Sequence, residues 1–184
     1  MGGIAFVCWR LIRNLADNEE QALHQARHDP LTELPNRAAM LETLKTLRGD
    51  GKSQYVIAYA DLDGFKEVND IYGHHIGDRL LKSVSAGFSV IAENFNATLS
   101  RLGGDEFAFI LDGDEATLRA TDLSRAALGF LQVPIEIDGR ITRVGMSIGI
   151  AASAGGEKAA ELLRRADVAM YAAKKEKKNQ FLVY

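Results

Sequence analysis

The 184-residue sequence predicts an α+β domain whose central sheet contains strands of both directions. Three observations lead to this prediction. Helix-like and strand-like segments are interleaved along the chain, and residues 55–62 form a nearly continuous apolar run, typical of a central strand covered on both faces. Two short turns, Gly103-Gly104 and Asp138-Gly139, stand between β-rich runs and predict hairpins. Since hairpins join antiparallel strands, the sheet cannot be all parallel.

The composition narrows the class of protein. With 47% hydrophobic and 26% charged residues, the chain is typical of a soluble domain with one well-buried core. Its net charge of −3 gives no general attraction to nucleic acid. Cys8 is the single cysteine, which excludes an intramolecular disulfide framework and fits a reducing compartment such as the cytosol. Neither a GxxxxGK[ST] loop nor a strand-linked GxGxxG occurs, so the standard nucleotide-binding folds are disfavoured.

Residues 1–27 are expected to form a helical arm ahead of a domain at 28–184. Gly3 to Trp9 is apolar and is followed by Arg10 and Arg13, but a bilayer span needs about 20 apolar residues. Two interpretations stay open: the stub of a transmembrane helix with its arginines on the cytoplasmic side, or an amphipathic helix that packs on the domain or on a second copy. A weak a/d-like spacing favours a linker helix that could pair in a dimer; it consists of Ile12, Leu15, Ala22 and Ala26.

The domain is expected to begin with an ordered turn. His28 to Arg37 contains two prolines, which should end the arm helix. Asn36 can cap a helix that runs to about Leu47. After a loop at Gly49 to Ser53 comes the predicted central strand, Tyr55 to Leu62. The first helix would bury Met40, Leu41, Leu44 and Leu47.

Asp61 and Asp63 lie at the end of this buried strand, where like charges raise each other's pKa. A divalent cation would relieve that cost. The spacing is not an EF-hand, because Phe65 stands where a third oxygen ligand belongs and Lys66 where the glycine belongs. A hard-metal site completed by a distant carboxylate and by phosphates fits Mg²⁺. The alternative is that one aspartate caps the next helix and the other faces water.

Phe65 to Tyr72 predicts a short helix ended by Gly73, and a second helix is expected from about Arg79 to Ala92. His74 and Asp78 then lie in a glycine-bounded bend, near Asn69 and Asp70. Asn and Asp side chains can bind the edge of a guanine base, although the same residues also form turns and caps. Lys66 would lie near the metal, where a fixed cation could stabilise a transferring phosphoryl group; otherwise it is a surface lysine.

Arg101 to Phe107 is the hairpin between strand-like runs at 96–101 and 107–111. Gly103-Gly104 is predicted as a two-residue turn with positive φ. The turn presents Asp105 and Glu106 at the mouth of the hairpin. This arrangement suits a metal and a phosphate, and it also suits a plain solvated turn.

The rest of the chain predicts more elements of the same sheet. A helix is expected from Glu115 to Phe130, then a hairpin through Asp138-Gly139 into a run at 141–151. Gly149 marks close backbone packing within the buried strand at 147–151. The last strand is expected at Phe181 to Tyr184.

A final helix is expected from Glu157 to Lys175. Lys174 and Lys178 would share one face if the helix continues, a spacing that can grip a polyphosphate. The alternative is a solvated basic helix end, which the helix dipole favours. The inward side would contain Leu162, Ala166, Ala169, Met170 and Ala173.

Taken together, the motifs resemble the GGDEF domain family, whose members make cyclic di-GMP. The resemblance covers about Asp29 to the C-terminus. In chain order the motifs are Asp29-Pro-Leu-Thr, Leu34-Pro-Asn-Arg37, Asp61-Leu-Asp-Gly-Phe-Lys66, Asn69-Asp70, Gly73-His74, Gly77-Asp78, Arg101-Leu-Gly-Gly-Asp-Glu-Phe107 and Ala166-Asp167 through Ala173-Lys174.

The resemblance implies a central, mostly antiparallel five-stranded sheet wrapped by helices, with a ferredoxin-like core related to nucleotidyl cyclase and polymerase palm domains. It implies that Asp61 and Asp105 bind two Mg²⁺ ions, which Mn²⁺ could replace, assisted by the Leu62 carbonyl and by Glu106. Each domain would bind one GTP, and two copies would face each other so that each 3′-hydroxyl attacks the other α-phosphate. Asp105 would accept the proton.

The remaining implied contacts are with the nucleotide. Asn69 and Asp78 would bind guanine, with His74 also touching the substrate. Lys66, Lys174 and Lys178 would hold the triphosphate, and the substrate would also border Phe65, Gly103 and Gly104. The cytoplasm is the implied location, with the domain either free or tethered to the inner membrane through the arm.

The sequence departs from the family pattern at three places. Many members carry an RxxD product-inhibition site before the signature, and here Phe95 and Thr98 stand at the positions that we match to it. We therefore expect no strong product feedback through that site. Glu33 replaces a usual glycine in the early turn, and Lys177 stands where a glycine is common.

Two other functions stay open beside an active diguanylate cyclase. One is a catalytically silent GTP-binding module that regulates an attached phosphodiesterase or other output domain. The other is a membrane-tethered dimerisation or scaffold module, which rests on the arm alone.

Overall fold

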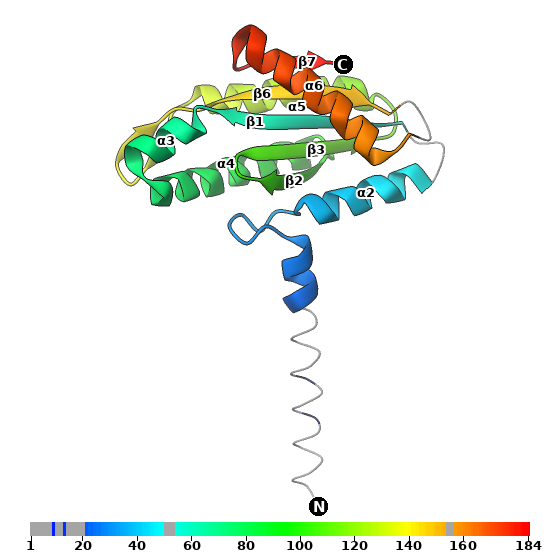
Figure 1. Cartoon of the computed structure of the whole chain (residues 1–184), viewed down its shortest axis with the longest axis horizontal. Coiled ribbons are helices and arrows are strands. Elements are labelled where there is room, and N and C mark those ends of the chain that lie inside the picture. Colours follow the sequence, from blue (N-terminus) through cyan, green and yellow to red (C-terminus); the bar gives the residue numbers. More distant parts are fainter. Residues whose placement is uncertain (1–8, 10–12, 14–20, 50–53, 154–156) are drawn as a thin grey trace, which may run out of the picture.

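The computed structural model describes residues 9, 13, 21–49, 54–153 and 157–184. Its five-stranded sheet, flanked by helices on both faces, confirms the predicted α+β fold (Figure 1). The elements are α2 Arg37–Gly49, β1 Tyr55–Asp63, α3 Phe65–Tyr72, α4 His74–Asn94, β2 Thr98–Gly103, β3 Glu106–Asp112, α5 Ala116–Gln132, β4 Ile135–Ile137, β5 Arg140–Thr142, β6 Gly145–Ala152, α6 Ala159–Lys177 and β7 Phe181–Val183.

The sheet order is β2-β3-β1-β6-β7, with β1 in the centre as its apolar run predicted. Strand β1 is antiparallel to both β3 and β6, and only β7 runs parallel to its neighbour, β6. The register sets Asp61 directly opposite Glu106 on one side and Ser147 on the other. Since residues that face each other across strands point to the same side of a sheet, these three polar residues share one face.

The sheet has two different faces. Alternate residues of β1, including Ala58 and Ala60, pack towards α4 and α5, where Phe88 makes edge-to-face contacts with Phe107 and Phe109 at 5.3 and 5.7 Å between ring centroids. The residues between them pack towards α2 and α6. Asp61 belongs to this second set because side chains alternate along a strand. The α2 and α6 face buries Met40, Leu44, Leu162, Ala166 and Met170.

Helix α6 lies directly on the backbone of β6, as Gly149 predicted. A Cβ at Gly149 would stand 1.9 Å from the Ala166 carbonyl oxygen and 2.2 Å from the Met170 amide nitrogen. Any side chain there would push the helix off the sheet. The close approach holds the C-terminal half of α6 over the end of β1 (Figure 1).

Some predicted boundaries were wrong. Helix α4 begins at His74 rather than Arg79, because Gly73 ends α3 while Gly77 is accommodated inside a helix. The loop of the central hairpin is Gly104-Asp105, since Gly103 still pairs with Glu106. The run at 141–151 divides into β5, which pairs with β4 in a separate ribbon, and β6. Helix α6 ends at Lys177, so Lys178 does not extend the helical face of Lys174.

The N-terminal part agrees with the predicted turn. Residues 21–27 are helical, and His28 and Pro35 form an isolated bridge. Asn36 caps α2 through its Oδ1, which accepts from the amides of Ala38 at 2.9 Å and Ala39 at 3.1 Å. Residues 3–8, 12 and 15 of the predicted arm, and 50–53 of the predicted loop, lie outside the described residues. Of the helices in the described part, none has the length and apolar character to cross a bilayer.

Candidate active site

The central hairpin pairs with β1 through the β1–β3 ladder, and one more backbone hydrogen bond extends this pairing to its loop. The amide of Leu62 donates to the carbonyl oxygen of Asp105 at 3.1 Å. Gly103 and Gly104 have φ of 134° and 52°, conformations that L side chains rarely adopt. The two glycines therefore turn the chain so that Asp105 meets the strand end that carries Asp61.

Arg101 holds the hairpin in this position. Its Nε and Nη2 donate to the Gly104 carbonyl oxygen at 3.1 and 2.6 Å, and its Nη1 donates to Asp29 at 2.6 Å. Asp29 also accepts from the amide and hydroxyl of Thr32, at 2.9 and 2.7 Å. Burial opposes the charge of Asp29, but the bonds from Thr32 and Arg101 outweigh burial, and its pKa lies below the ordinary value.

Acidic charge is concentrated at the junction. Burial, and then the charge of Asp61, raise the pKa of Asp105. Lys174, from α6, is the counter-charge, with its Nζ 2.5 Å from Asp61 Oδ1. Burial disfavours the Lys174 ammonium, yet the bond and charge of Asp61 raise its pKa above the ordinary value. The predicted concentration of carboxylates is therefore present, partly compensated by one lysine.

Asp63 does not belong to this partly buried cluster of Asp61, Asp105 and Lys174. It is buried, and its Oδ2 accepts from the Ser147 hydroxyl at 2.8 Å and from the Asn179 amide at 3.0 Å. Helix α3 is preceded by Gly64 and has no side-chain cap. The alternative in which one aspartate caps the helix and the other faces water is thus wrong. Asp63 joins β1 to β6 and to the turn after α6.

The residues expected to bind guanine meet where α3 packs on α4. Asn69 Oδ1 is buried without a partner in the described part of the protein. A Cβ at Gly77 would lie 1.9 Å from that oxygen, so Gly77 provides the space for Asn69. His74 and Asp78 are exposed and four residues apart on α4, and therefore lie on the same side of the helix.

The remaining predicted residues lie around this centre. Phe65 is buried in the core, while Lys66 is exposed on the first turn of α3. Lys178 is exposed just after α6. Glu106 points to the α2 and α6 face, where it lines the same cavity as Tyr59. Burial, followed by the charge of Glu106, raises the pKa of this tyrosine above its usual range.

The donor set fits a hard cation. The Asp61 and Asp105 carboxylates supply oxygen donors at the same end of β1, and burial followed by the charge of Asp61 raises the pKa of Asp105. Within the described ranges, however, no three His, Cys, Asp or Glu side chains are grouped to hold an ion by themselves. Mg²⁺ is commonly held by one or two carboxylates together with substrate phosphates, so the site suits a metal that arrives with a nucleotide.

Sequence reasoning assigned no role to Arg101, Arg37 or Tyr59. Arg101 was part of a motif, but its contact with Asp29 joins residues 72 positions apart. Arg37 and Tyr59 line a cavity of about 500 Å³ with Glu106, between α2 and α6. The available signal for Arg37 was its place directly after the Asn36 cap, which sets it on the first turn of α2.

The mixed sheet, with Asp61 at the end of its central strand and Asp105 in the adjoining hairpin loop, is the architecture expected of a GGDEF domain. Residues 26–180 match the family model described as "Diguanylate cyclase, GGDEF domain". The chain belongs to this family. It is 37% identical over 95% of its length to the bifunctional diguanylate cyclase/cyclic di-GMP phosphodiesterase MucR of Pseudomonas aeruginosa, and 35% identical over 88% to the diguanylate cyclase TpbB of the same species.

Solved structures agree with the fold. The GGDEF domain of TpbB has a TM-score of 0.79 and 33% identity, covering 85% of this chain and 93% of that one. The coiled coil and GGDEF domain of DgcB from Caulobacter crescentus, in complex with c-di-GMP, has a TM-score of 0.88 at 26% identity, covering 98% and 97%. The chain spans 26% of MucR and 38% of TpbB, so both relatives are much longer proteins.

Proposed function

We propose that this domain is a diguanylate cyclase that condenses two GTP molecules into cyclic di-GMP and two pyrophosphates across a homodimer. The observation that carries the proposal is the docking of Asp105 onto the end of β1 beside Asp61, through the Leu62 amide. Family membership supports the reaction, and the paired carboxylates with Lys174 support the chemistry.

Separate residues would bind the metal ions and the triphosphate. Asp61 and Asp105, with the Leu62 carbonyl, would hold two Mg²⁺ ions, and Mn²⁺ could replace them. When bound, these ions supply stabilisation of charge on the attacking and leaving oxygens. Lys174 would leave Asp61 for the triphosphate when cations neutralise the carboxylate. Lys178 would contact the same phosphates.

Base recognition and proton transfer would rest on other groups. Asn69, Asp78 and His74 would bind guanine, which matches the unpartnered oxygen of Asn69 beside Gly77. Asp105 would accept the proton of the 3′-hydroxyl; its raised pKa makes it a better base than an ordinary aspartate. Lys66, exposed on α3, would stabilise negative charge on the transferring phosphoryl group.

The reaction needs two half-sites, because a single domain would hold one nucleotide. The test is to hold two copies together through a fused dimerisation segment, add GTP and Mg²⁺, and separate the products by chromatography. We expect cyclic di-GMP from the wild-type sequence and none from Asp105→Ala. Its absence from a dimer that binds GTP would contradict the proposal.

A silent regulatory module is the second candidate. The relative MucR is named as bifunctional, and the present chain corresponds to about a quarter of its length. Attached output domains and a cytoplasmic location, free or membrane-tethered, are therefore also proposals. The same dimer experiment separates the two functions, since a silent module would bind GTP without forming product.

A further inference from the structure

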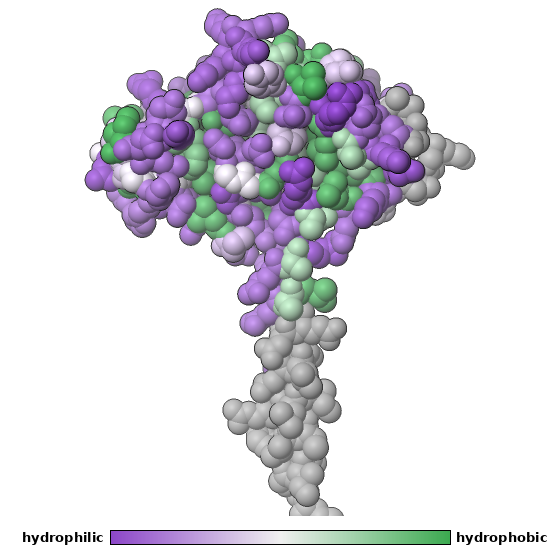
Figure 2. Space-filling view, viewed as in Figure 1, coloured by the Kyte–Doolittle hydropathy of each residue, from purple (hydrophilic) through white to green (hydrophobic). Residues whose placement is uncertain are grey.

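The cavity between α2 and α6 is built from opposed polar groups on apolar walls. It has a volume of about 500 Å³, within the range of ligand pockets. Leu41 of α2 and Leu163 of α6 form apolar walls, and Tyr59 with Glu106 forms the floor on the sheet. Hydrophobic surface is visible among polar side chains between these helices (Figure 2).

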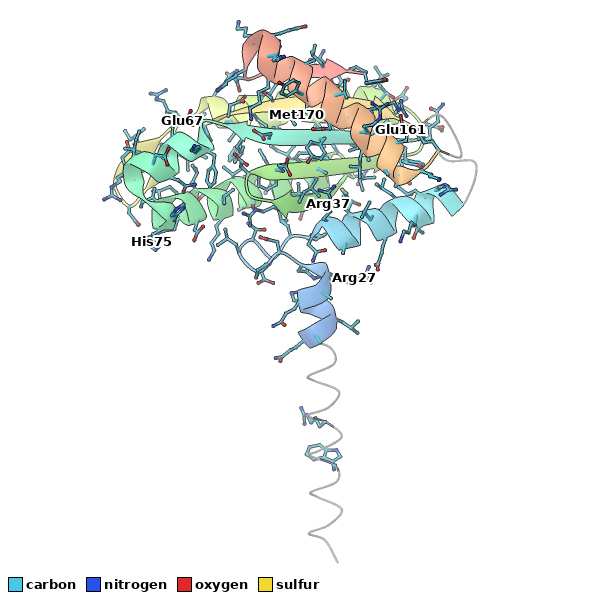
Figure 3. All side chains as sticks on the ribbon, viewed as in Figure 1. Arg27, Arg37, Glu67, His75, Glu161 and Met170 are labelled. Carbon is cyan, nitrogen blue, oxygen red and sulfur yellow. The ribbon has the colours of Figure 1, made fainter. Side chains whose placement is uncertain are left out.

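Arg37 and Asp167 line this cavity from its two helices. Neither side chain has a hydrogen bond or ion pair among the described residues. Arg164, also at the cavity, is different because it makes two bonds to Glu161, at 2.7 and 3.1 Å. Figure 3 shows Arg37 where α2 begins and Glu161 on the first part of α6. Among the described residues, the cavity thus offers the unpaired guanidinium of Arg37 and the unpaired carboxylate of Asp167, with the Glu106 carboxylate on its floor.

This combination excludes simple ions. A phosphate would meet the carboxylates of Asp167 and Glu106, and a cation would meet Arg37 and Arg164. A ligand must instead present acceptors to Arg37, donors to Asp167 and a flat apolar body to the two leucines. Guanine has these properties, since its O6 and N7 accept from arginine in a bidentate contact and its N1 and exocyclic amino group donate to a carboxylate.

We propose that the cavity between α2 and α6 binds a guanine base, held by Arg37 and Asp167, at a site separate from the guanine site proposed above at Asn69 and Asp78. Adenine does not fit, because it lacks the adjacent N1 and amino donors that a carboxylate can accept together. The guanine of GTP and that of cyclic di-GMP share this chemistry. The site lies against Glu106 of the hairpin, so its occupant touches the signature directly.

The test is calorimetric titration with GMP of the whole chain carrying Asp78→Asn, which removes the proposed guanine contact of the active site. We expect one GMP per chain to remain bound, and its affinity to fall at least tenfold on adding Asp167→Asn or Arg37→Gln. Arg48→Gln, at the other end of α2, is the matched control and should leave affinity unchanged. AMP should not bind.

Two results overturn the proposal: loss of all GMP binding in Asp78→Asn alone, or equal affinity with and without Asp167→Asn. Titrations with GTP and with cyclic di-GMP then identify the natural source, as the tighter ligand. Both substitutions are at exposed side chains, and unchanged melting curves will confirm folding. Binding is measured without turnover, so failure here leaves the proposed cyclase activity untouched.

Discussion

Arg101 and Asp29 form an ion pair at 2.6 Å in which the two side chains are only 8% and 16% exposed. The same guanidinium holds the carbonyl of Gly104. The pair therefore connects the turn that follows the 21–27 helix with the loop that carries Asp105. Because the 21–27 helix enters the domain through this turn, the contact links that helix directly to the active-site loop.

We expect Asp29→Asn to lower the free energy of unfolding by about 2 kcal/mol, since hydrogen bonds to charged groups contribute about 1.5–3 kcal/mol. The pKa of Asp29 is lowered in the folded protein, so its contribution is present above the unfolded pKa, about 3.9, and is lost as the pH falls through the folded pKa. Urea unfolding at several pH values measures this. The difference from wild type should be constant near neutrality and shrink below about pH 4.

The control for Asp29 is Asp122→Asn. Asp122 makes an exposed i,i+3 pair with Arg125, and such pairs contribute about 0–1 kcal/mol. An equal loss of unfolding free energy in both variants would mean that the buried pair stabilises the fold no more than an exposed pair.

Replacing the charged Asp105 by a neutral residue should increase the stability of the folded protein. The pKa of Asp105 is raised on folding, so ionised Asp105 opposes folding at neutral pH, and this cost disappears as the pH falls below the unfolded pKa. We expect Asp105→Asn to raise the melting temperature at pH 7 and not at pH 3.5, while cyclase turnover falls by about 10²–10⁴-fold. A lower melting temperature at pH 7 would show that the carboxylates are not in conflict.

Asp61 should determine the response to ligand. We expect Mg²⁺ with GTP to raise the melting temperature of the wild type by several degrees, since ligand at 100 times its Kd adds about 2.7 kcal/mol. Asp61→Ala should show no rise. Differential scanning fluorimetry with and without EDTA measures both, and an equal rise in the two proteins would remove Asp61 from the proposed metal site.

Gly77→Ala should weaken nucleotide binding with little effect on folding. Its Cβ would displace the Asn69 side chain, whose Oδ1 lies 1.9 Å away. We expect the KM for GTP to rise about tenfold, which corresponds to about 1.4 kcal/mol. Gly129→Ala, in α5, meets nothing within 4 Å and serves as the control; it should leave KM unchanged and add up to about 1 kcal/mol of stability.

Much of the fold was determined by local sequence. The apolar run at 55–62 predicted the central strand, and Asn36 predicted the start of α2, because periodicity and capping act over a few residues. Gly149 predicted close packing, and α6 lies on its backbone. The motif order also predicted the family that the comparison with its model confirmed.

Features that depend on contacts between residues far apart in the sequence were decided only by the tertiary structure. The predicted start of α4 at about Arg79 was wrong because Gly77 was placed in a bend before the helix. In the structure Gly77 lies inside α4, where the absence of a side chain leaves space for Asn69. The sequence could not distinguish the roles of Asp61 and Asp63, because both are aspartates at the end of the same strand. In the structure, Lys174 contacts Asp61, whereas Ser147 and Asn179 contact Asp63. Burial and charge pairing arise from residues tens of positions apart, so the sequence alone determined which groups are present, and the packing of the sheet and α6 decided which of them meet.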